Sequence, residues 1–168
     1  MSVIWLTGLS GSGKQAIAEK LSNHIDSQVV DGDVIRRNLS SDLRHGIIDK
    51  KEHYNRVVNF IKSNLKKSDC TIVAIVSANK GDRGWIKDQF EKDKVKFYEI
   101  YVKASLKTCE KRDPKGLYAR YRKGEDIKLA GLTEEYQEPD FPFLICNTEN
   151  ETVEVSARNI LKVFKNKV

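Results

Sequence analysis

A glycine-rich segment near the beginning of the chain has the residue types and the spacing of a phosphate-binding loop. Residues 8–14 read Gly-Leu-Ser-Gly-Ser-Gly-Lys, which matches G-x-x-x-x-G-K between an apolar run and a segment of helical periodicity. Glycines let successive backbone N–H groups point at phosphate oxygens, the helix N-terminus adds partial positive charge, and Lys14 can neutralise the β and γ phosphates. The residues predicted to bind ATP here are Gly8, Leu9, Ser10, Gly11, Ser12, Gly13, Lys14 and Gln15.

The residue after this lysine departs from the usual pattern. Position 15, where a serine or threonine normally offers its hydroxyl to Mg²⁺, holds Gln15. A glutamine carbonyl can bind a hard cation directly or through water, so we expect an active Mg²⁺ site. The alternative is a weakened metal site in a regulatory module that binds ATP without turning it over.

Two carboxylates follow the second apolar run. Asp31 and Asp33 come directly after Val29 and Val30. If that run is a strand of a doubly wound sheet, both carboxylates lie at the carboxyl edge where such proteins bind ligands, facing the γ-phosphate. Such a pair can fix Mg²⁺ and accept the proton of an attacking hydroxyl. The predicted metal ligands are therefore Asp31, Asp33 and Gln15, and the alternative for the two carboxylates is a solvated turn.

Apolar runs of strand length alternate with segments of helical periodicity along the chain. The runs are 3–6, 29–30, 71–76, 97–102 and 143–146, and apolar stripes at helical spacing fall at 17–25, 57–65 and 153–164. Near-continuous apolar strands joined by helices favour a parallel sheet covered on both faces. The sequence predicts a single α/β domain over residues 1–168, a three-layer α/β/α P-loop NTPase fold with a five-stranded parallel sheet.

The stretch 111–139 is polar, rich in Arg, Lys and Gly, and too long for an ordinary connection between strands. We expect it to form a mobile lid. Lys115, Arg120 and Arg122 on this lid could swing inward and supply cations to the migrating phosphoryl group. The alternative for these three side chains is a solvated surface role.

The composition is that of a globular protein, with 39% hydrophobic and 32% charged residues and no apolar stretch long enough to span a bilayer. The N-terminus lacks the features of a signal peptide, and the three scattered cysteines form no Cys-x-x-Cys pair, so we expect a cytoplasmic protein with reduced thiols. The net charge of +6 is not gathered into a basic tail or a nucleic-acid-binding motif. We therefore expect neither a nucleic-acid nor a membrane partner.

Several blocks of the sequence occur in the order seen in one family of P-loop kinases. Besides the loop at 8–14, they are Asp31-Gly32-Asp33 with Arg36, Leu39, Asp42 and Leu43, then Ser77 with Asp82 and Arg83, and the run Cys109 to Tyr118. The chain resembles an adenylyl-sulfate kinase from Ile4 to about Phe164. The resemblance implies transfer of the ATP γ-phosphate to the 3'-hydroxyl of adenosine 5'-phosphosulfate, with Mg²⁺ as cofactor and a lid that closes over both nucleotides.

The resemblance also assigns roles to single residues. Asp31 would be the general base, and Lys14 and Ser77 would complete the catalytic group, although direct in-line transfer needs no covalent step on Ser77. Arg112 and Asn147 would lie beside ATP. A small nucleotide is the implied partner, and a homodimer is common in the family. The implied acceptor-binding residues are Asp33, Arg36, His45, Lys50, His53, Ser77, Lys115 and Leu129.

The acceptor half departs from the family pattern more than the donor half does. The two phenylalanines that hold the acceptor adenine are replaced by His45 and Leu129, and an Arg and an Asn of the following helix are replaced by Lys50 and His53. Stacking contributes about 1–3 kcal/mol per base, so the preference for adenine should fall by more than about tenfold. An alternative acceptor is a cytidine diphosphate derivative such as CDP-phosphoramidate. A GTPase-like switch is disfavoured because no Asn-Lys-x-Asp segment follows the fourth apolar run.

Overall fold

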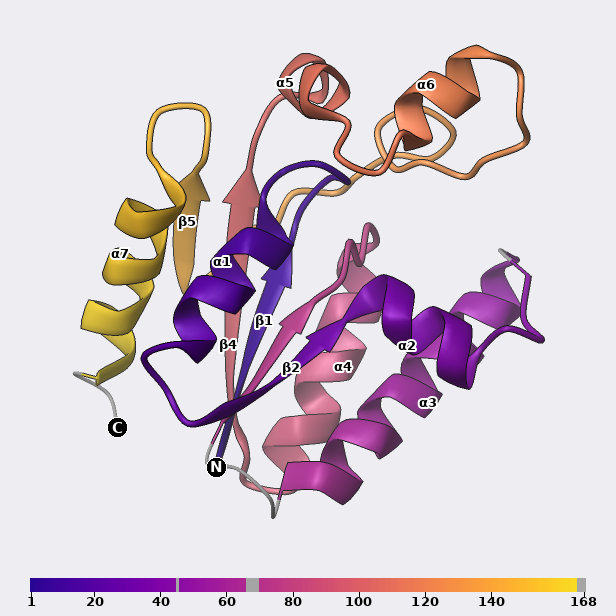
Figure 1. The fold of residues 1–168 in the computed structure, drawn as a ribbon. Coiled ribbons are helices and arrows are strands. Elements are labelled where there is room, and N and C mark those ends of the chain that lie inside the picture. The colour runs from indigo at the N-terminus through magenta and orange to yellow at the C-terminus, as the bar shows by residue number, and fades with distance from the viewer. Residues whose placement is uncertain (45, 66–69, 166–168) are drawn as a thin grey trace.

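The computed structural model describes residues 1–44, 46–65 and 70–165, so His45, a predicted acceptor-binding residue, lies outside the described residues. A five-stranded sheet with the order β2-β3-β1-β4-β5 forms the centre of this part of the chain, and all its strand pairs are parallel (Figure 1). The strands are β1 (Ser2–Thr7), β2 (Ser27–Asp31), β3 (Cys70–Ala74), β4 (Lys96–Lys103) and β5 (Leu144–Asn147). The predicted sheet is confirmed, each strand within two residues of its apolar run.

Helices cover both faces of the sheet, as the three-layer prediction required. The helices are α1 (Lys14–Ser22), α2 (Gly32–Leu39), α3 (Ile47–Asn64), α4 (Lys80–Lys92), α5 (Leu106–Arg112), α6 (Leu117–Arg122) and α7 (Val153–Lys165). Side chains of α1 and α7 belong to the apolar core on one face, and those of α2, α3 and α4 to the core on the other. Figure 1 shows α5 and α6 beyond the carboxyl ends of the strands.

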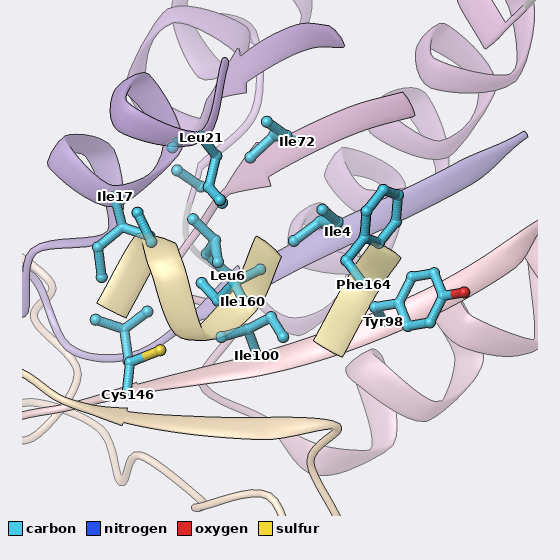
Figure 2. Packing of buried hydrophobic residues seen from close by; sticks show 14 of the residues in the cluster. Ile4, Leu6, Ile17, Leu21, Ile72, Tyr98, Ile100, Cys146, Ile160 and Phe164 are labelled. Atoms are coloured by element: carbon cyan, nitrogen blue, oxygen red, sulfur yellow. The ribbon is translucent and has the colours of Figure 1, made fainter. Parts of the chain in front are cut away.

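The core under α1 and α7 explains the helical periodicity of these segments. Figure 2 shows Ile17 and Leu21 of α1 and Ile160 and Phe164 of α7 gathered over Ile100 and its neighbours on the sheet. Ile17, Leu21 and Ile100 are fully buried. Burying each such side chain contributes about 1.5–3 kcal/mol, so this layer holds α1, and with it the end of the phosphate-binding loop, against the sheet.

The sheet order places β1 between β3 and β4. The carboxyl end of β1, where Gly8 begins, therefore opens between the loops that follow both neighbouring strands. In open parallel sheets ligands bind at such a point. The topology thus brings the glycine-rich loop, the residues after β3 and the segment after β4 to one edge of the sheet.

The region expected to form a lid contains an apolar core of its own. Ala104, Cys109, Tyr118 and Leu129 are buried together, with Leu9 of the glycine-rich loop packed against them. These residues come from α5, α6 and irregular segments, so they show neither the strand nor the helix period in the sequence. We call this group the lid cluster, and it packs the lid against the first loop of the site.

Two expectations about the whole chain can be compared with the described residues. Cys70, Cys109 and Cys146 are all buried thiols outside any disulfide, as expected for reduced core cysteines. In the three described ranges, every helix is too short or too polar to cross a bilayer.

Candidate functional site

A cavity of about 1250 Å³ lies at the carboxyl edge of the sheet, and most of the predicted site residues line it. The predicted residues in its wall are Ser10, Gly11, Gly13, Lys14, Gln15, Asp31, Asp33, Arg36, Lys50, His53, Ser77, Arg112, Lys115 and Leu129. Donor-side and acceptor-side residues therefore share one continuous space. Its size suits two nucleotides better than one, because single ligand pockets usually measure about 300–1000 Å³.

Four predicted ATP-binding residues do not line this cavity. Gly8 and Ser12 belong to the loop but are not part of the cavity wall, and Ser12 is fully buried. Leu9 turns to the lid cluster, and Asn147 accepts a hydrogen bond from the backbone N–H of Glu149 (3.2 Å). These residues shape the backbone of the site instead of forming its wall.

Two glycines of the loop occupy positions that exclude other residues. Gly8 has a φ of +150°, and a Cβ built there would lie 2.3 Å from the Val102 carbonyl oxygen of β4. Gly13 is the N-cap of α1 with a φ of +104°, in the left-handed region. The close approach of the loop to β4 and the sharp entry into α1 therefore both require glycine.

Lys14 is buried, and its ammonium group is bound by the loop itself. Nζ donates to the carbonyl oxygens of Gly8 (2.9 Å) and Leu9 (2.7 Å). Burial lowers the pKa of Lys14 to about 8, against the opposing effect of nearby Asp33 and Asp31. A bound triphosphate would place negative charge beside this ammonium group and so offset the loss of its hydration.

The predicted metal ligands provide oxygen donors of the kind that Mg²⁺ prefers. Gln15, Asp31 and Asp33 all line the cavity. The Gln15 amide nitrogen donates to Glu19 one turn along α1 (3.1 Å), which turns its amide oxygen away from that carboxylate. Among the described residues no group of three or more His, Cys, Asp or Glu side chains is arranged to hold a metal alone. The set therefore fits a cation that also takes phosphate oxygens and water as ligands.

Asp31 is held in a fixed direction because it caps a helix. Its Oδ1 accepts hydrogen bonds from the backbone N–H groups of Asp33 (2.9 Å) and Val34 (3.1 Å) at the start of α2. Both bonds go to the same oxygen, so Oδ2 can receive a further proton or cation. Through these two bonds the side chain caps the N-terminus of α2.

Two ion pairs join the lid to the acceptor side of the cavity. Lys115 of the lid pairs with Asp33, and Lys50 of α3 pairs with Glu134 of the lid. Both pairs are partly exposed, so each contributes no more than about 1 kcal/mol to closure. The lid thus contacts the acceptor side through ion pairs with α2 and α3.

Contacts outside the cavity hold the remaining acceptor-side residues in place. Arg36 donates to the Leu43 carbonyl oxygen (3.0 Å), which closes the loop after α2. His53 is buried, and its Nδ1 lies 2.9 Å from the Ser40 hydroxyl oxygen. Leu129 is 4% exposed and belongs to the lid cluster, where it presents an aliphatic surface to the cavity.

Ser77 is buried, with its hydroxyl turned to the core. Its Oγ accepts a hydrogen bond from the Trp5 indole N–H (3.1 Å), and its backbone has a φ of +47°. The hydrogen bond from Trp5 therefore helps to maintain the backbone conformation of the loop after β3.

On the ATP side, Arg112 binds the loop that follows β5. Its guanidinium donates to the Thr148 side-chain oxygen (3.0 Å), and the Thr148 hydroxyl donates to the Ser12 carbonyl oxygen (2.8 Å). Arg120 and Arg122 pair instead with Glu125 and Glu110 on the outside of the lid. Neither of these arginines lines the cavity in the described structure.

Sequence reasoning missed several residues of the wall. Tyr54, Glu134 and Thr148 line the cavity without belonging to a motif, and burial raises the pKa of Tyr54 to about 12. Tyr54 follows His53 directly, and Thr148 follows Asn147, so proximity to predicted residues was the only signal for either. Glu134 is identified only through its ion pair with Lys50.

The sequence and the fold are similar to those of known nucleotide kinases. The family described as Adenylylsulphate kinase matches residues 1–147. The adenylyl-sulfate kinase of Bacillus licheniformis is 38% identical over 169 residues, covering 98% of this chain and 85% of that protein. The probable adenylyl-sulfate kinase of Bacillus subtilis is 35% identical over 172 residues, covering 99% and 86%. The structure of Mycobacterium tuberculosis APS kinase in complex with AMPPNP and APS gives a TM-score of 0.89 at 28% identity, covering 98% of this chain and 97% of the other.

Proposed function

The chain belongs to the adenylylsulphate kinase family, and from that membership we propose that it transfers the γ-phosphoryl group of ATP to the 3'-hydroxyl of a nucleotide-derived acceptor. Adenosine 5'-phosphosulfate is the first candidate for that acceptor. The observation that carries the proposal is the shared cavity, in which Lys14 and the glycine-rich loop lie on one side and Arg36, Lys50 and Lys115 on the other. Asp31 lines the same space.

The residues of the cavity have different roles in an in-line phosphoryl transfer. Lys14 exchanges its loop carbonyl partners for the phosphate oxygens of ATP and neutralises charge that builds up on them. Asp31, fixed by its two backbone donors, accepts the proton of the acceptor hydroxyl. Lys115 and the rest of the lid exclude water, which would otherwise compete with the acceptor.

Mg²⁺ is part of this proposal. Gln15, Asp31 and Asp33 would hold it, and when bound it would neutralise charge on the β and γ phosphate oxygens. Gln15→Thr restores the usual hydroxyl, and we expect it to lower the Mg²⁺ concentration for half-maximal rate by about three- to tenfold, because the short threonine side chain places its hydroxyl where the usual motif binds the phosphate-bound ion. The measurement is a Mg²⁺ titration of the initial rate, with Gln15→Ala as the matched control. Identical titration curves for Gln15→Thr, Gln15→Ala and wild type would remove Gln15 from the metal site.

A cytidine diphosphate derivative is the second candidate acceptor, favoured by the composition of the wall. Among the described lining residues, the aromatic side chains are Tyr54 and His53, both buried, and the lid presents Leu129. A purine would therefore find an aliphatic surface where the family pattern offers a ring. A smaller pyrimidine loses less by that exchange, because stacking energy grows with ring overlap.

The deciding experiment offers both acceptor classes to the purified protein. Adenosine 5'-phosphosulfate and CDP-phosphoramidate are incubated separately with ATP and Mg²⁺, and phosphorus NMR detects the new 3'-phosphate. Product from one acceptor identifies the class, and Lys14→Ala should abolish it. ATP binding by calorimetry without product from either acceptor would support the regulatory module instead, and absence of ATP binding would refute the proposal altogether.

The proposal also includes the cellular location and the oligomeric state of the protein. The three buried cysteine thiols, none of them in a disulfide, support a location in the reducing cytoplasm. A homodimer is also proposed, and size-exclusion chromatography with light scattering distinguishes it from a monomer of 19.2 kDa.

A further inference from the structure

A buried arginine outside the cavity connects three segments that meet around the acceptor. Arg83 of α4 is 3% exposed. Its guanidinium donates from Nε to Glu99 of β4, from Nη1 to the Ser77 carbonyl oxygen, and from Nη2 to the Gln137 carbonyl oxygen, each at 2.6 Å. Arg83 is not part of the described cavity wall, whereas Ser77 and Gln137 are.

The first of the connected segments is the loop after β3. Ser77 has a φ of +47°, which is unfavourable for a residue with a side chain and persists only where surrounding contacts maintain it. Arg83 binds its carbonyl oxygen, and Trp5 binds its hydroxyl. Thr7, the last residue of β1, donates to the carbonyl oxygen of the preceding Val76 (2.6 Å).

The second segment is the end of the lid. The Gln137 backbone N–H donates to the Ala78 carbonyl oxygen (2.9 Å), and the Gln137 side-chain oxygen accepts from the Lys80 backbone N–H (2.9 Å). Arg83 then binds the Gln137 carbonyl oxygen. The end of the lid and the loop after β3 are therefore fastened together, with the Arg83 side chain between them.

Only arginine suits this position. Glu99 balances its charge from β4, and the Tyr136 ring lies 5.6 Å from the guanidinium carbon. The planar guanidinium sends rigid donors in three directions, whereas lysine places one ammonium at a single point. Arg83→Lys therefore keeps the charge next to Glu99 but cannot reach both carbonyl groups.

We propose that Arg83 is a positioning residue for the acceptor: it holds Ser77 and the end of the lid as one unit, so acceptor binding depends on it and ATP binding does not. The inference rests on the proposed kinase activity for its kinetic consequence. The glycine-rich loop is held mainly by other contacts, through Lys14 and through Arg112 with Thr148, and its bond to the loop after β3, from the Gly8 N–H to the Val76 carbonyl oxygen, is long (3.4 Å), so ATP binding should be unaffected.

The kinetic test compares Arg83→Lys with Arg158→Lys, which changes an exposed arginine of α7 outside the cavity wall. Arg83→Lys should raise the KM for the acceptor at least about tenfold and leave the KM for ATP within about twofold, while Arg158→Lys should change neither. An equal rise in both constants, or no rise in either, would overturn the proposal. A wild-type enzyme silent toward every acceptor would instead count against the kinase activity.

A second readout needs no turnover. Hydrogen exchange of the Gln137 amide, which is bonded to Ala78, should become at least about tenfold faster in ligand-free Arg83→Lys, while the amides of α1 stay as in wild type. Unchanged exchange at Gln137 would contradict the fastening of the two segments, whatever the enzyme's activity. If Arg83→Lys does not fold, the double variant Arg83→Gln with Glu99→Gln replaces the buried ion pair by two amides and leaves no buried charge unpaired. It must show the same split of KM values and the same faster exchange, or the proposal fails.

Discussion

The ammonium group of Lys14 is buried, and burial disfavours its charged form. Burial lowers its pKa to about 8, and two carbonyl oxygens of its own loop are its partners in the ligand-free protein. A triphosphate placed beside Nζ favours the charged form and so raises the pKa again. Binding of ATP and binding of a proton at Lys14 are therefore coupled.

This coupling predicts the pH dependence of ATP binding. The free protein loses the Lys14 proton as the pH rises through about 8, so above this pH ATP binding must recover a proton, and the affinity should fall by up to about tenfold per pH unit. Calorimetry at pH 9 in two buffers of different ionisation enthalpy should show uptake approaching about one proton per ATP. Lys20→Ala, which changes an exposed lysine of the same helix, should leave the uptake unchanged. Absence of uptake at pH 9 in wild type would contradict the buried, easily neutralised Lys14.

At the residue scale, the predictable part of the site was the part with strict spacing. Lys14 ends the loop that follows β1 and Asp31 is the last residue of β2, and the roles of both depend on backbone geometry that glycine and carboxylate residues reveal in a sequence. Arg83 belongs to a family block, but its three partners lie 6, 16 and 54 positions away along the chain. No local pattern specifies such a connection, because it depends on the way β3, β4 and the lid are brought together.

Among the elements, the lid has two kinds of attachment. The lid cluster packs it on the glycine-rich loop, and Tyr118 donates to the Ser10 carbonyl oxygen (2.9 Å). On the acceptor side the lid is joined by the ion pairs Lys115–Asp33 and Lys50–Glu134 and by the contacts of Gln137. Salt and acidic ligands should therefore loosen the lid on its acceptor side first.

We expect the lid to open more readily when one of these ion pairs is removed. Glu134→Gln releases Lys50, and because a partly exposed pair contributes at most about 1 kcal/mol, trypsin should cut the Lys- and Arg-rich lid of the ligand-free protein about two to five times faster. Glu125→Gln is the matched control, since it breaks a pair with Arg120 within the lid. Equal cleavage rates for both variants would show that Lys50 and Glu134 do not hold the lid.

The lid also marks the limit of prediction at the element scale. Its position and its basic character were predicted from the polar stretch 111–139, and its mobility stays a prediction. Its apolar cluster was missed because Cys109, Tyr118 and Leu129 come from three short segments without a common period. Leu129 was assigned to the acceptor, and it serves both the cavity wall and this cluster.

For the whole molecule, the parallel sheet could be predicted because its strands are buried on both faces and read as continuous apolar runs. The strand order could not, since nothing local places β3 between β2 and β1. That order depends on how the crossover helices pack. It also decides which loops meet at the site, so the donor half, built on one loop, was easier to foresee than the acceptor half.

The unequal burial of two isoleucines predicts where the stability of the molecule lies. Ile100 of β4 is fully buried, whereas Ile145 of the edge strand β5 is 52% exposed. Ile100→Ala should lower the free energy of unfolding by about 2–5 kcal/mol, through lost burial and the cavity left behind. Ile145→Ala should cost less than about 1 kcal/mol. Urea unfolding followed by circular dichroism measures both, and similar losses would contradict the described core.

The lid is anchored at its two ends to opposite sides of the site. Its first part is bonded to the donor side through Arg112 and Tyr118, and its last part to the loop after β3 through Gln137. Leu129 packs with Tyr118 in the lid cluster, so the two parts of the lid also touch each other on either side of the exposed Gly124. A single backbone cut at Gly124 should therefore leave the lid assembled, and the nicked protein should still keep solvent away from the γ-phosphate.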